Sequence, residues 1–141
     1  MADEVLGITV GRKASLSKKI TAQDIELFAK VTGDTNPLHL DEAFAKRTRF
    51  KKRVCHGMLS AGLISAVLGT KLAGPNASPI YLGQSMRFLK PVFIGDTVTA
   101  SIEVKKVDPA RRILIVSTEC SNQDGQQILT GEATMMVDPL A

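Results

Sequence analysis

The sequence contains no tryptophan and one tyrosine among its 141 residues, so aromatic side chains are scarce. A single-stranded nucleic-acid binder interleaves aromatic with basic residues, and the chain lacks that pattern. The formal net charge of +4 is mild and suits an acidic small molecule as well as a polyanion. We therefore expect no nucleic-acid partner.

Cysteines and long apolar segments are also scarce. Cys55 and Cys120 stand alone without a C-x-x-C pairing, which is typical of reduced thiols in a cytosolic protein. The N-terminus has an acidic pair and no basic segment before an apolar run, so no signal peptide is predicted. The longest apolar run, Met58 to Gly69, is too short to span a bilayer. We expect one cytoplasmic domain, residues 1–141, without membrane contact.

The first third of the chain predicts a strand and two helices. Residues 13–20 are compatible with an early strand. Thr21 is a plausible N-cap of the helix that follows, with Asp24 three residues on, and Gly33 is a typical helix end. A second, short helix is predicted after Asp41.

The segment 56–74 is apolar on nearly every side and rich in small residues. Such a segment predicts a buried helix. Each glycine inside it, such as Gly62 or Gly69, costs about 1 kcal/mol relative to alanine. That cost indicates close approach by another backbone or by a ligand.

After Pro79 the apolar residues alternate, which predicts strands at 80–89, 97–107, 111–120 and 127–137. In the first of them Ile80, Leu82, Met86 and Phe88 are expected on one face. The expected faces of the second and fourth strands are Val98, Ala100, Ile102 and Val104, and Leu129, Ala133, Met135 and Val137. Short turn-like breaks predict an antiparallel meander. A meander wrapped around the helix at 56–74 is an α+β hot-dog fold, and an ordinary α+β sandwich is the alternative.

The segment TGDTNPLHL, Thr32 to Leu40, combines turn residues with an acid and an imidazole. Asp34 and Asn36 could simply form Asx turns, with His39 on the surface. Alternatively, Asp34 and His39 could converge on one water molecule, because imidazole exchanges protons near neutral pH.

His56 and Gly57 open the helix predicted at 56–74. Backbone N–H groups at a helix N-terminus can stabilise a developing oxyanion. Gly57 could instead only permit tight packing. A nucleophilic pair of Cys55 and His56 is disfavoured, because sequence neighbours usually point apart. The histidines and acids show no recognisable ligand spacing, so no metal is expected.

Taken together, these residues resemble the MaoC-like, (R)-specific enoyl-CoA hydratase family. The family motif matches Phe28, the run Gly33-Asp34-Thr35-Asn36-Pro37-Leu38-His39, and Ala45. VCHGMLSAGLIS resembles the start of the family's central helix, and PIYLGQSMRFLKPVFIGDTV resembles its next strand and turn. The similarity runs from about Lys13 to Val137.

The resemblance implies a homodimeric hot-dog fold and reversible hydration of trans-2-enoyl-CoA to (R)-3-hydroxyacyl-CoA. It implies that Asp34 and His39 are the acid–base pair, that Asn36 helps to hold them, and that the Gly57 N–H faces the thioester oxygen. Family members often carry a serine on the central helix at the position matched here to Gly62. Ser60 is the substitute candidate, and the difference bears on acyl-chain preference.

Substrate contacts are also expected from the basic run Lys46–Arg53, which is otherwise a solvated face. Arg49 and Lys52 are the candidates for contact with the coenzyme A phosphates, and His56 is a further substrate-binding candidate. No metal or redox cofactor is expected, since coenzyme A arrives as part of the substrate.

Three alternatives remain open. A hot-dog thioesterase would hydrolyse the thioester and has less use for His39. A 3-hydroxyacyl-thioester dehydratase would act on carrier-protein substrates through the same residues. A non-catalytic binding or dimerisation module would not need a paired acid and imidazole. β-Oxidation, polyhydroxyalkanoate precursor supply and fatty acid synthesis are all possible pathways.

Overall fold

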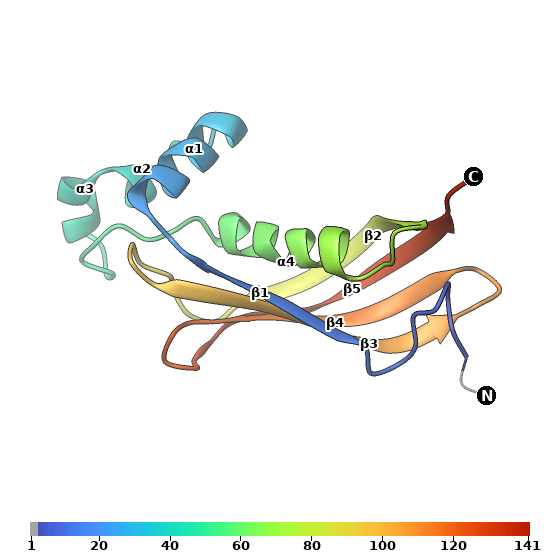
Figure 1. Cartoon of the computed structure of the whole chain (residues 1–141). Helices are drawn as coiled ribbons and strands as arrows, with labels where there is room; N and C mark the ends of the chain where they lie inside the picture. Colours follow the sequence, from blue (N-terminus) through green and yellow to red (C-terminus); the bar gives the residue numbers. More distant parts are fainter. Residues whose placement is uncertain (1–2) are drawn as a thin grey trace.

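The computed structural model describes residues 3–141, which form one sheet, one long helix and three shorter helices (Figure 1). The strands are β1 (Lys13–Lys19), β2 (Ala77–Phe88), β3 (Thr97–Asp108), β4 (Ile113–Ser121) and β5 (Gln127–Pro139). The helices are α1 (Ala22–Thr32), α2 (Pro37–Leu40), α3 (Glu42–Lys46) and α4 (Gly57–Lys71). The sheet lies along α4 in the predicted α+β hot-dog arrangement, with α1, α2 and α3 gathered at one end.

The sheet has the strand order β1-β3-β4-β5-β2, and every neighbouring pair is antiparallel. The predicted meander is right for β3, β4 and β5. It is wrong for β2, which pairs with β5 at the opposite edge from β1. The connection between β2 and β3 is not a hairpin turn, because β4 and β5 lie between the two strands. Two backbone hydrogen bonds anchor this connection: the Leu89 N–H donates to Ile128 O and the Cys55 N–H to Val92 O, both at 2.7 Å.

A β-bulge also corrects the predicted face of β2. Ile80 pairs with Met136 and Met86 pairs with Gly131, with a register shift between Tyr81 and Gly83. The shift places Ile80 and Met86 on opposite faces of the sheet, because one extra residue inverts the alternation. The prediction that they share a face is therefore wrong.

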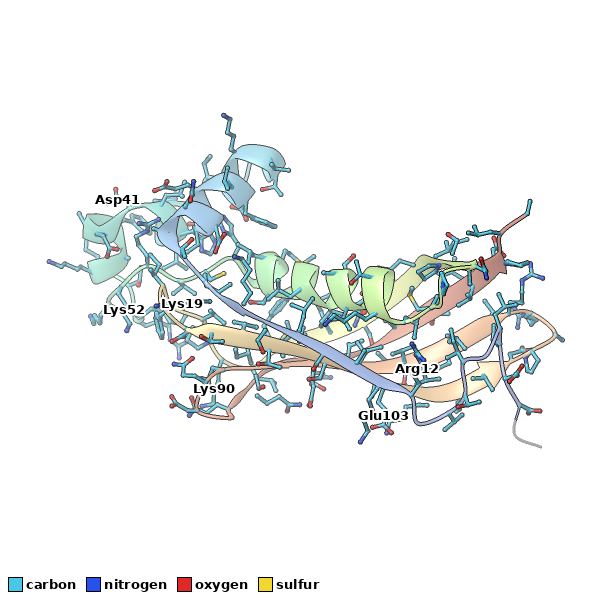
Figure 2. All side chains as sticks on the ribbon, viewed as in Figure 1. Arg12, Lys19, Asp41, Lys52, Lys90 and Glu103 are labelled. Carbon is cyan, nitrogen blue, oxygen red and sulfur yellow. The ribbon has the colours of Figure 1, made fainter. Side chains whose placement is uncertain are left out.

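The core lies between α4 and the inner face of the sheet, where side chains fill the space (Figure 2). Ile64, Val67 and Leu68 of α4 are fully buried. They pack with strand residues that the alternation placed inward, such as Val98 and Val104. The predicted inner faces of β3 and β5 are confirmed, since these buried residues include Val98, Ala100, Ile102, Val104, Leu129, Ala133, Met135 and Val137.

Helix α4 is buried on one side only in the described chain. Met58, Gly62, Ser65 and Gly69 are exposed on its other side. The prediction of a helix buried all round is therefore not met within one copy of the chain. No helix among residues 3–141 is long and apolar enough to cross a membrane.

The caps of α1 are those that the sequence predicts, and they set where the next loop begins. The Thr21 hydroxyl accepts from the Asp24 N–H at 3.1 Å, and the Asp24 carboxylate accepts from the Thr21 N–H at 2.9 Å. At the other end Gly33 has a φ of 80°, and its N–H donates to Ala29 O. This left-handed residue ends the helix and turns the chain into residues 34–36.

The left-handed backbone of Gly33 gives a stability prediction. We expect Gly33→Ala to lower the free energy of unfolding by roughly 1–2 kcal/mol, because a Cβ is strained in this region. Gly33→Asn should cost less than Gly33→Ala, because asparagine enters the left-handed region more readily. Urea denaturation of the three proteins measures both differences. Equal stability of the alanine variant and the parent would contradict the assignment.

Candidate active site

The loop from Thr32 to Leu40 is built by short side-chain hydrogen bonds to the backbone. The Thr32 hydroxyl accepts from the Asp34 N–H at 3.2 Å, and the Asp34 carboxylate accepts from the Asn36 N–H at 3.3 Å. Asn36 then caps α2 by accepting from the Leu38 N–H at 3.0 Å. The Asx turns of the local interpretation therefore form, and they bend the chain so that α2 carries His39 back toward Asp34.

His39 is held by a backbone carbonyl. Its Nδ1 lies 2.6 Å from Val54 O. Because a carbonyl only accepts, Nδ1 carries the proton of the neutral ring and Nε2 keeps a free lone pair. Arg53 Nε donates to His39 O at 2.7 Å, so the residue is fixed through both its ring and its backbone. The free nitrogen is the one available for proton transfer.

His56 lies directly behind this pair and is 2% exposed. Its Nε2 lies 3.0 Å from the backbone oxygen of Asp34. Its ring centroid is 4.0 Å from that of His39 and 4.7 Å from that of Phe28. Burial lowers the pKa of His56, and the neighbouring His39 lowers it further, against the opposing effect of Asp34.

Asp34, His39 and His56 form one cluster, with one donor atom from each lying within 4.8 Å of the others. It is the single group of this kind among residues 3–141 that could hold a metal ion. Two imidazoles and a carboxylate form a common set of ligands for divalent transition metals. The expectation of no metal remains a prediction.

The cluster opens into a cavity of about 590 Å³. Asp34 and His39 line one part of the cavity, and Gly57, Phe88 and Ile128 line others. As the first residue of α4, Gly57 has a backbone N–H with no carbonyl partner in its own helix. A Cβ on Gly57 would come within 2.7 Å of the Phe88 ring. The cavity therefore combines an acid, an imidazole and a helix N-terminus.

The remaining candidates from the sequence are placed differently. Arg49 and Ser60 line the cavity. The Ser60 hydroxyl is buried and has no hydrogen-bond partner within residues 3–141. Gly62 lines a separate groove between α4 and β2. Lys52 is not among the cavity residues, and its ammonium lies 4.2 Å from the centre of the Phe93 ring.

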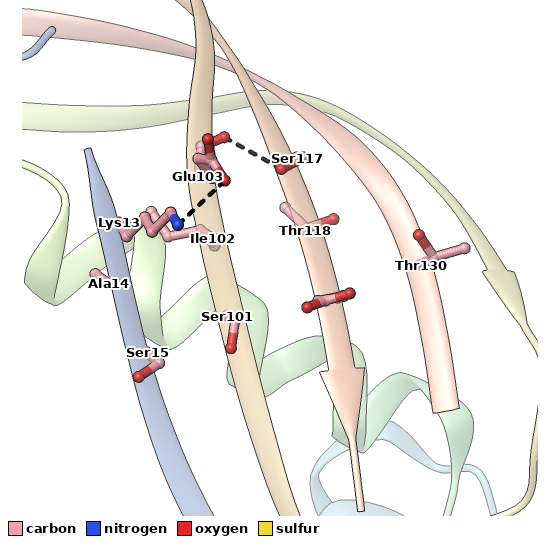
Figure 3. A pocket seen from close by; sticks show the side chains of 10 residues that line it. Lys13, Ala14, Ser15, Ser101, Ile102, Glu103, Ser117, Thr118 and Thr130 are labelled. Carbon is pink, nitrogen blue, oxygen red and sulfur yellow. Dashed lines mark hydrogen bonds and ion pairs between the residues drawn. The ribbon is translucent and has the colours of Figure 1, made fainter. Parts of the chain in front are cut away.

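A second hollow, of about 530 Å³, lies on the outer face of the sheet and is lined mainly by hydroxyl and charged side chains (Figure 3). Lys13 Nζ lies 3.9 Å from the Glu103 carboxylate, and Ser117 Oγ donates to Glu103 O at 3.3 Å. Its lining contains no histidine. Imidazole is the side chain that ordinarily titrates near neutral pH, so we place acid–base chemistry in the first cavity.

Sequence reasoning missed three contacts at this site. The Val54 carbonyl that orients His39 and the Asp34 carbonyl that meets His56 are backbone groups, which leave no signature in residue type. Phe88 covers Gly57 because β2 ends beside the start of α4. Its position in an alternating strand predicted its face and not its partner.

The protein is a hot-dog protein in which one cavity contains an acid, an imidazole and a helix N-terminus. The MaoC-like domain matches residues 7–125. The chain belongs to this family, as the resemblance in its sequence predicted.

Individual relatives cover nearly the whole chain. It is 51% identical over 130 residues to an (R)-specific enoyl-CoA hydratase from Rhodospirillum rubrum, covering 92% of this chain and 88% of the relative. It is 46% identical over 140 residues to a 3-hydroxybutyryl-CoA dehydratase from Methylorubrum extorquens, covering 95% and 87%. The solved structure of an (R)-hydratase from Aeromonas caviae matches with a TM-score of 0.86 and 45% identity over 92% of this chain and 97% of that one.

The buried thiols give a prediction that separates this site from cysteine chemistry. Burial raises the pKa of Cys55 and of Cys120 to about 12. Both thiols should therefore stay protonated and react negligibly with a disulfide reagent at pH 8 in the folded protein. Both should react fully once guanidinium unfolds the chain. Rapid labelling of Cys55 in the folded protein would restore a nucleophilic role for it.

Proposed function

We propose that this protein catalyses the reversible addition of water to trans-2-enoyl-CoA, which gives (R)-3-hydroxyacyl-CoA. The observation that carries the proposal is that Asp34 and His39 meet in one cavity beside the N-terminus of α4. The names of the two relatives describe the hydration and dehydration directions of this chemistry. The (R) configuration is taken from the name of the hydratase relative.

The thioester carbonyl is placed against the Gly57 N–H in this proposal. A hydrogen bond there, at the positive end of the helix dipole, withdraws electron density from the conjugated double bond. The β-carbon becomes electrophilic, and the enolate that forms when water attacks is stabilised at its oxygen. The Phe88 ring lies where a Cβ on Gly57 would stand, and both residues line the cavity.

Asp34 and His39 handle the water. One of them takes a proton from the water as its oxygen bonds to the β-carbon, and a proton is delivered to the α-carbon. The sum is one H and one OH added, with no change in oxidation state overall, so the reaction has no need of a redox cofactor. Holding water and alkene together supplies much of the rate gain.

The coenzyme A portion is proposed to lie over the basic end of the molecule. Lys19, Lys52 and Lys90 lie toward the end that carries α1, α2 and α3 (Figure 2). Arg49 lines the cavity itself. Their positive charge favours an anionic tail outside the cavity.

Free thiols at Cys55 and Cys120 support a reducing location, which we propose to be the cytoplasm.

Loss of the acid–base pair gives the test of this function. With crotonyl-CoA as substrate, we expect Asp34→Asn and His39→Asn each to lower the hydration rate by at least ~10², the scale of losing general acid–base catalysis. The rate is followed by the loss of the enoyl absorbance, and the product is trapped with an (R)-specific dehydrogenase. Glu26→Gln, at an exposed position of α1 outside the cavity, is the charge-matched control for Asp34→Asn and should retain full activity.

Four results would redirect the proposal. Full activity in either variant would remove the pair from the mechanism. Product taken only by an (S)-specific dehydrogenase would contradict the stereochemistry. Release of free coenzyme A thiol, detected by a thiol reagent, would indicate a thioesterase. A rate that is much higher with the crotonyl group on a carrier protein would identify that carrier as the substrate.

We propose further that two copies of the chain assemble through β2 and the exposed side of α4. Among residues 3–141, β2 is paired on one side only and leaves Ile80, Tyr81 and Leu82 exposed. A long, apolar free edge of this kind invites another strand, whereas the other edge, β1, is short and carries three lysines. The exposed Gly62 and Gly69 make close helix approach possible.

The dimer is tested at Gly62. Nothing lies within 4 Å of a Cβ added there, and leucine favours a helix over glycine, so Gly62→Leu should fold in a single copy. The larger side chain should prevent close approach of a second α4 and convert the protein to monomer. Sedimentation velocity measures the change. Gly74→Leu, in the turn after α4, is the matched control and should remain dimeric. A dimeric Gly62→Leu protein would exclude this face.

A further inference from the structure

We propose that His56 is a positioning residue of the acid–base site, which holds the backbone of Asp34 and supports the ring of His39 as a neutral Nε2–H imidazole. The role rests on the proposed hydratase function. His56 also lines the cavity, so the role stands beside the expectation, drawn from sequence, that His56 contacts substrate, which remains a prediction. Three contacts of this buried ring, with the Asp34 backbone, His39 and Phe28, support the role.

The hydrogen bonds decide the tautomer of His56. Its Nε2 lies 3.0 Å from the Asp34 backbone oxygen, which can only accept, so Nε2 carries the proton. Its Nδ1 is buried and has no partner within residues 3–141. A proton on Nδ1 would create a buried donor without an acceptor, which is more costly than a bare lone pair that lacks a donor. Nδ1 is therefore unprotonated.

The surroundings of the ring keep it uncharged. The titratable groups that face it are His39 and Asp34, and Phe28 covers it with an apolar ring. Burial is the largest influence and lowers the pKa of His56, and His39 lowers it further. Asp34 raises it through its carbonyl and its carboxylate without reversing the direction. His39 is the more exposed of the two rings, so the buried ring of His56 is the one that serves as support.

Position along the chain gives His56 a second role. It is the N-cap residue of α4 but makes no side-chain cap bond, so its ring is free to contact Asp34, which lies 22 residues earlier. The residue that follows it is Gly57, the proposed oxyanion donor. One side chain therefore ties the loop that carries the acid to the turn that carries the N–H. A shift in this contact changes the distance between the two halves of the site.

Two substitutions separate the hydrogen bond from the bulk of the ring. His56→Phe keeps an apolar ring and removes the donor, whereas His56→Gln places an amide N–H near the position of Nε2. We expect His56→Phe to lower kcat for crotonyl-CoA by ~10- to 100-fold, with KM changed less than about threefold, because misplacement by about 1 Å costs on that scale. His56→Gln should recover most of the lost kcat.

The control and the contrary outcomes are defined for folded proteins. Leu59→Met, in the first turn of α4, conserves volume at a residue outside the cavity and should keep the parent kcat. Circular dichroism establishes that each variant is folded. A folded His56→Phe protein with the parent kcat would overturn the proposal. A folded His56→Gln protein as impaired as His56→Phe would also overturn it.

A measurement on the unaltered protein does not depend on activity, and it uses a variant only to assign the two rings. The chain has two histidines, so long-range ¹H–¹⁵N spectra of the imidazoles contain two ring systems, assigned with His39→Asn. We expect the His56 ring to show a protonated Nε2 and a bare Nδ1 at neutral pH, because burial lowers its pKa below the ordinary value of 6.5. A charged ring or an Nδ1–H tautomer would refute the role. Absence of hydratase activity in the parent would refute the proposed function alone.

Discussion

The packing of α4 against the inner face of the sheet is the constraint on which the other features depend. Ile64, Val67 and Leu68 are fully buried there, and burying such a side chain contributes ~1.5–3 kcal/mol each. A single hydrogen bond at the site, such as that of His39 to Val54 O, contributes ~0.5–1.5 kcal/mol. The core therefore fixes where α4 begins, and the weaker contacts of the loop adjust to that position. The N-terminus of α4 is at the cavity because the helix has no freedom to slide.

Much of the fold follows from local sequence, because its determinants are local. Thr21 and Asp24 form the predicted capping box, and Gly33 ends α1 in the predicted left-handed conformation. Alternation predicted the inner faces of β3 and β5. The position of β2 could not be predicted in this way, because alternation gives the faces of a strand and does not give its partner. The bulge at Leu82 could not be predicted either, because an extra residue interrupts the alternation without showing which residue is the extra one.

The site divides along the same line. Asp34 and His39 share a short segment, so turn chemistry alone predicted that they could converge. His56 meets Asp34 across 22 residues and through a carbonyl, so residue type carried no information about the contact. A charge run does not define which side chain points where: the ammonium of Lys52 lies over Phe93, and its contact with coenzyme A remains a prediction. Gly62, which the resemblance matches to a serine of the family's central helix, lies in the groove between α4 and β2.

The location of Gly62 links assembly to catalysis. Glycine inside a helix costs about 1 kcal/mol, and nothing in the described chain approaches Gly62 to compensate. Met58 lines both the groove that contains Gly62 and the cavity that contains Asp34 and His39. A second copy seated over the groove would therefore border the active site. Helix α4 would then carry the proposed oxyanion donor at Gly57 and contact the second copy near Gly62, about one turn later. In this arrangement, the shape of the acyl pocket is a property of the pair of chains, and neither chain alone determines it.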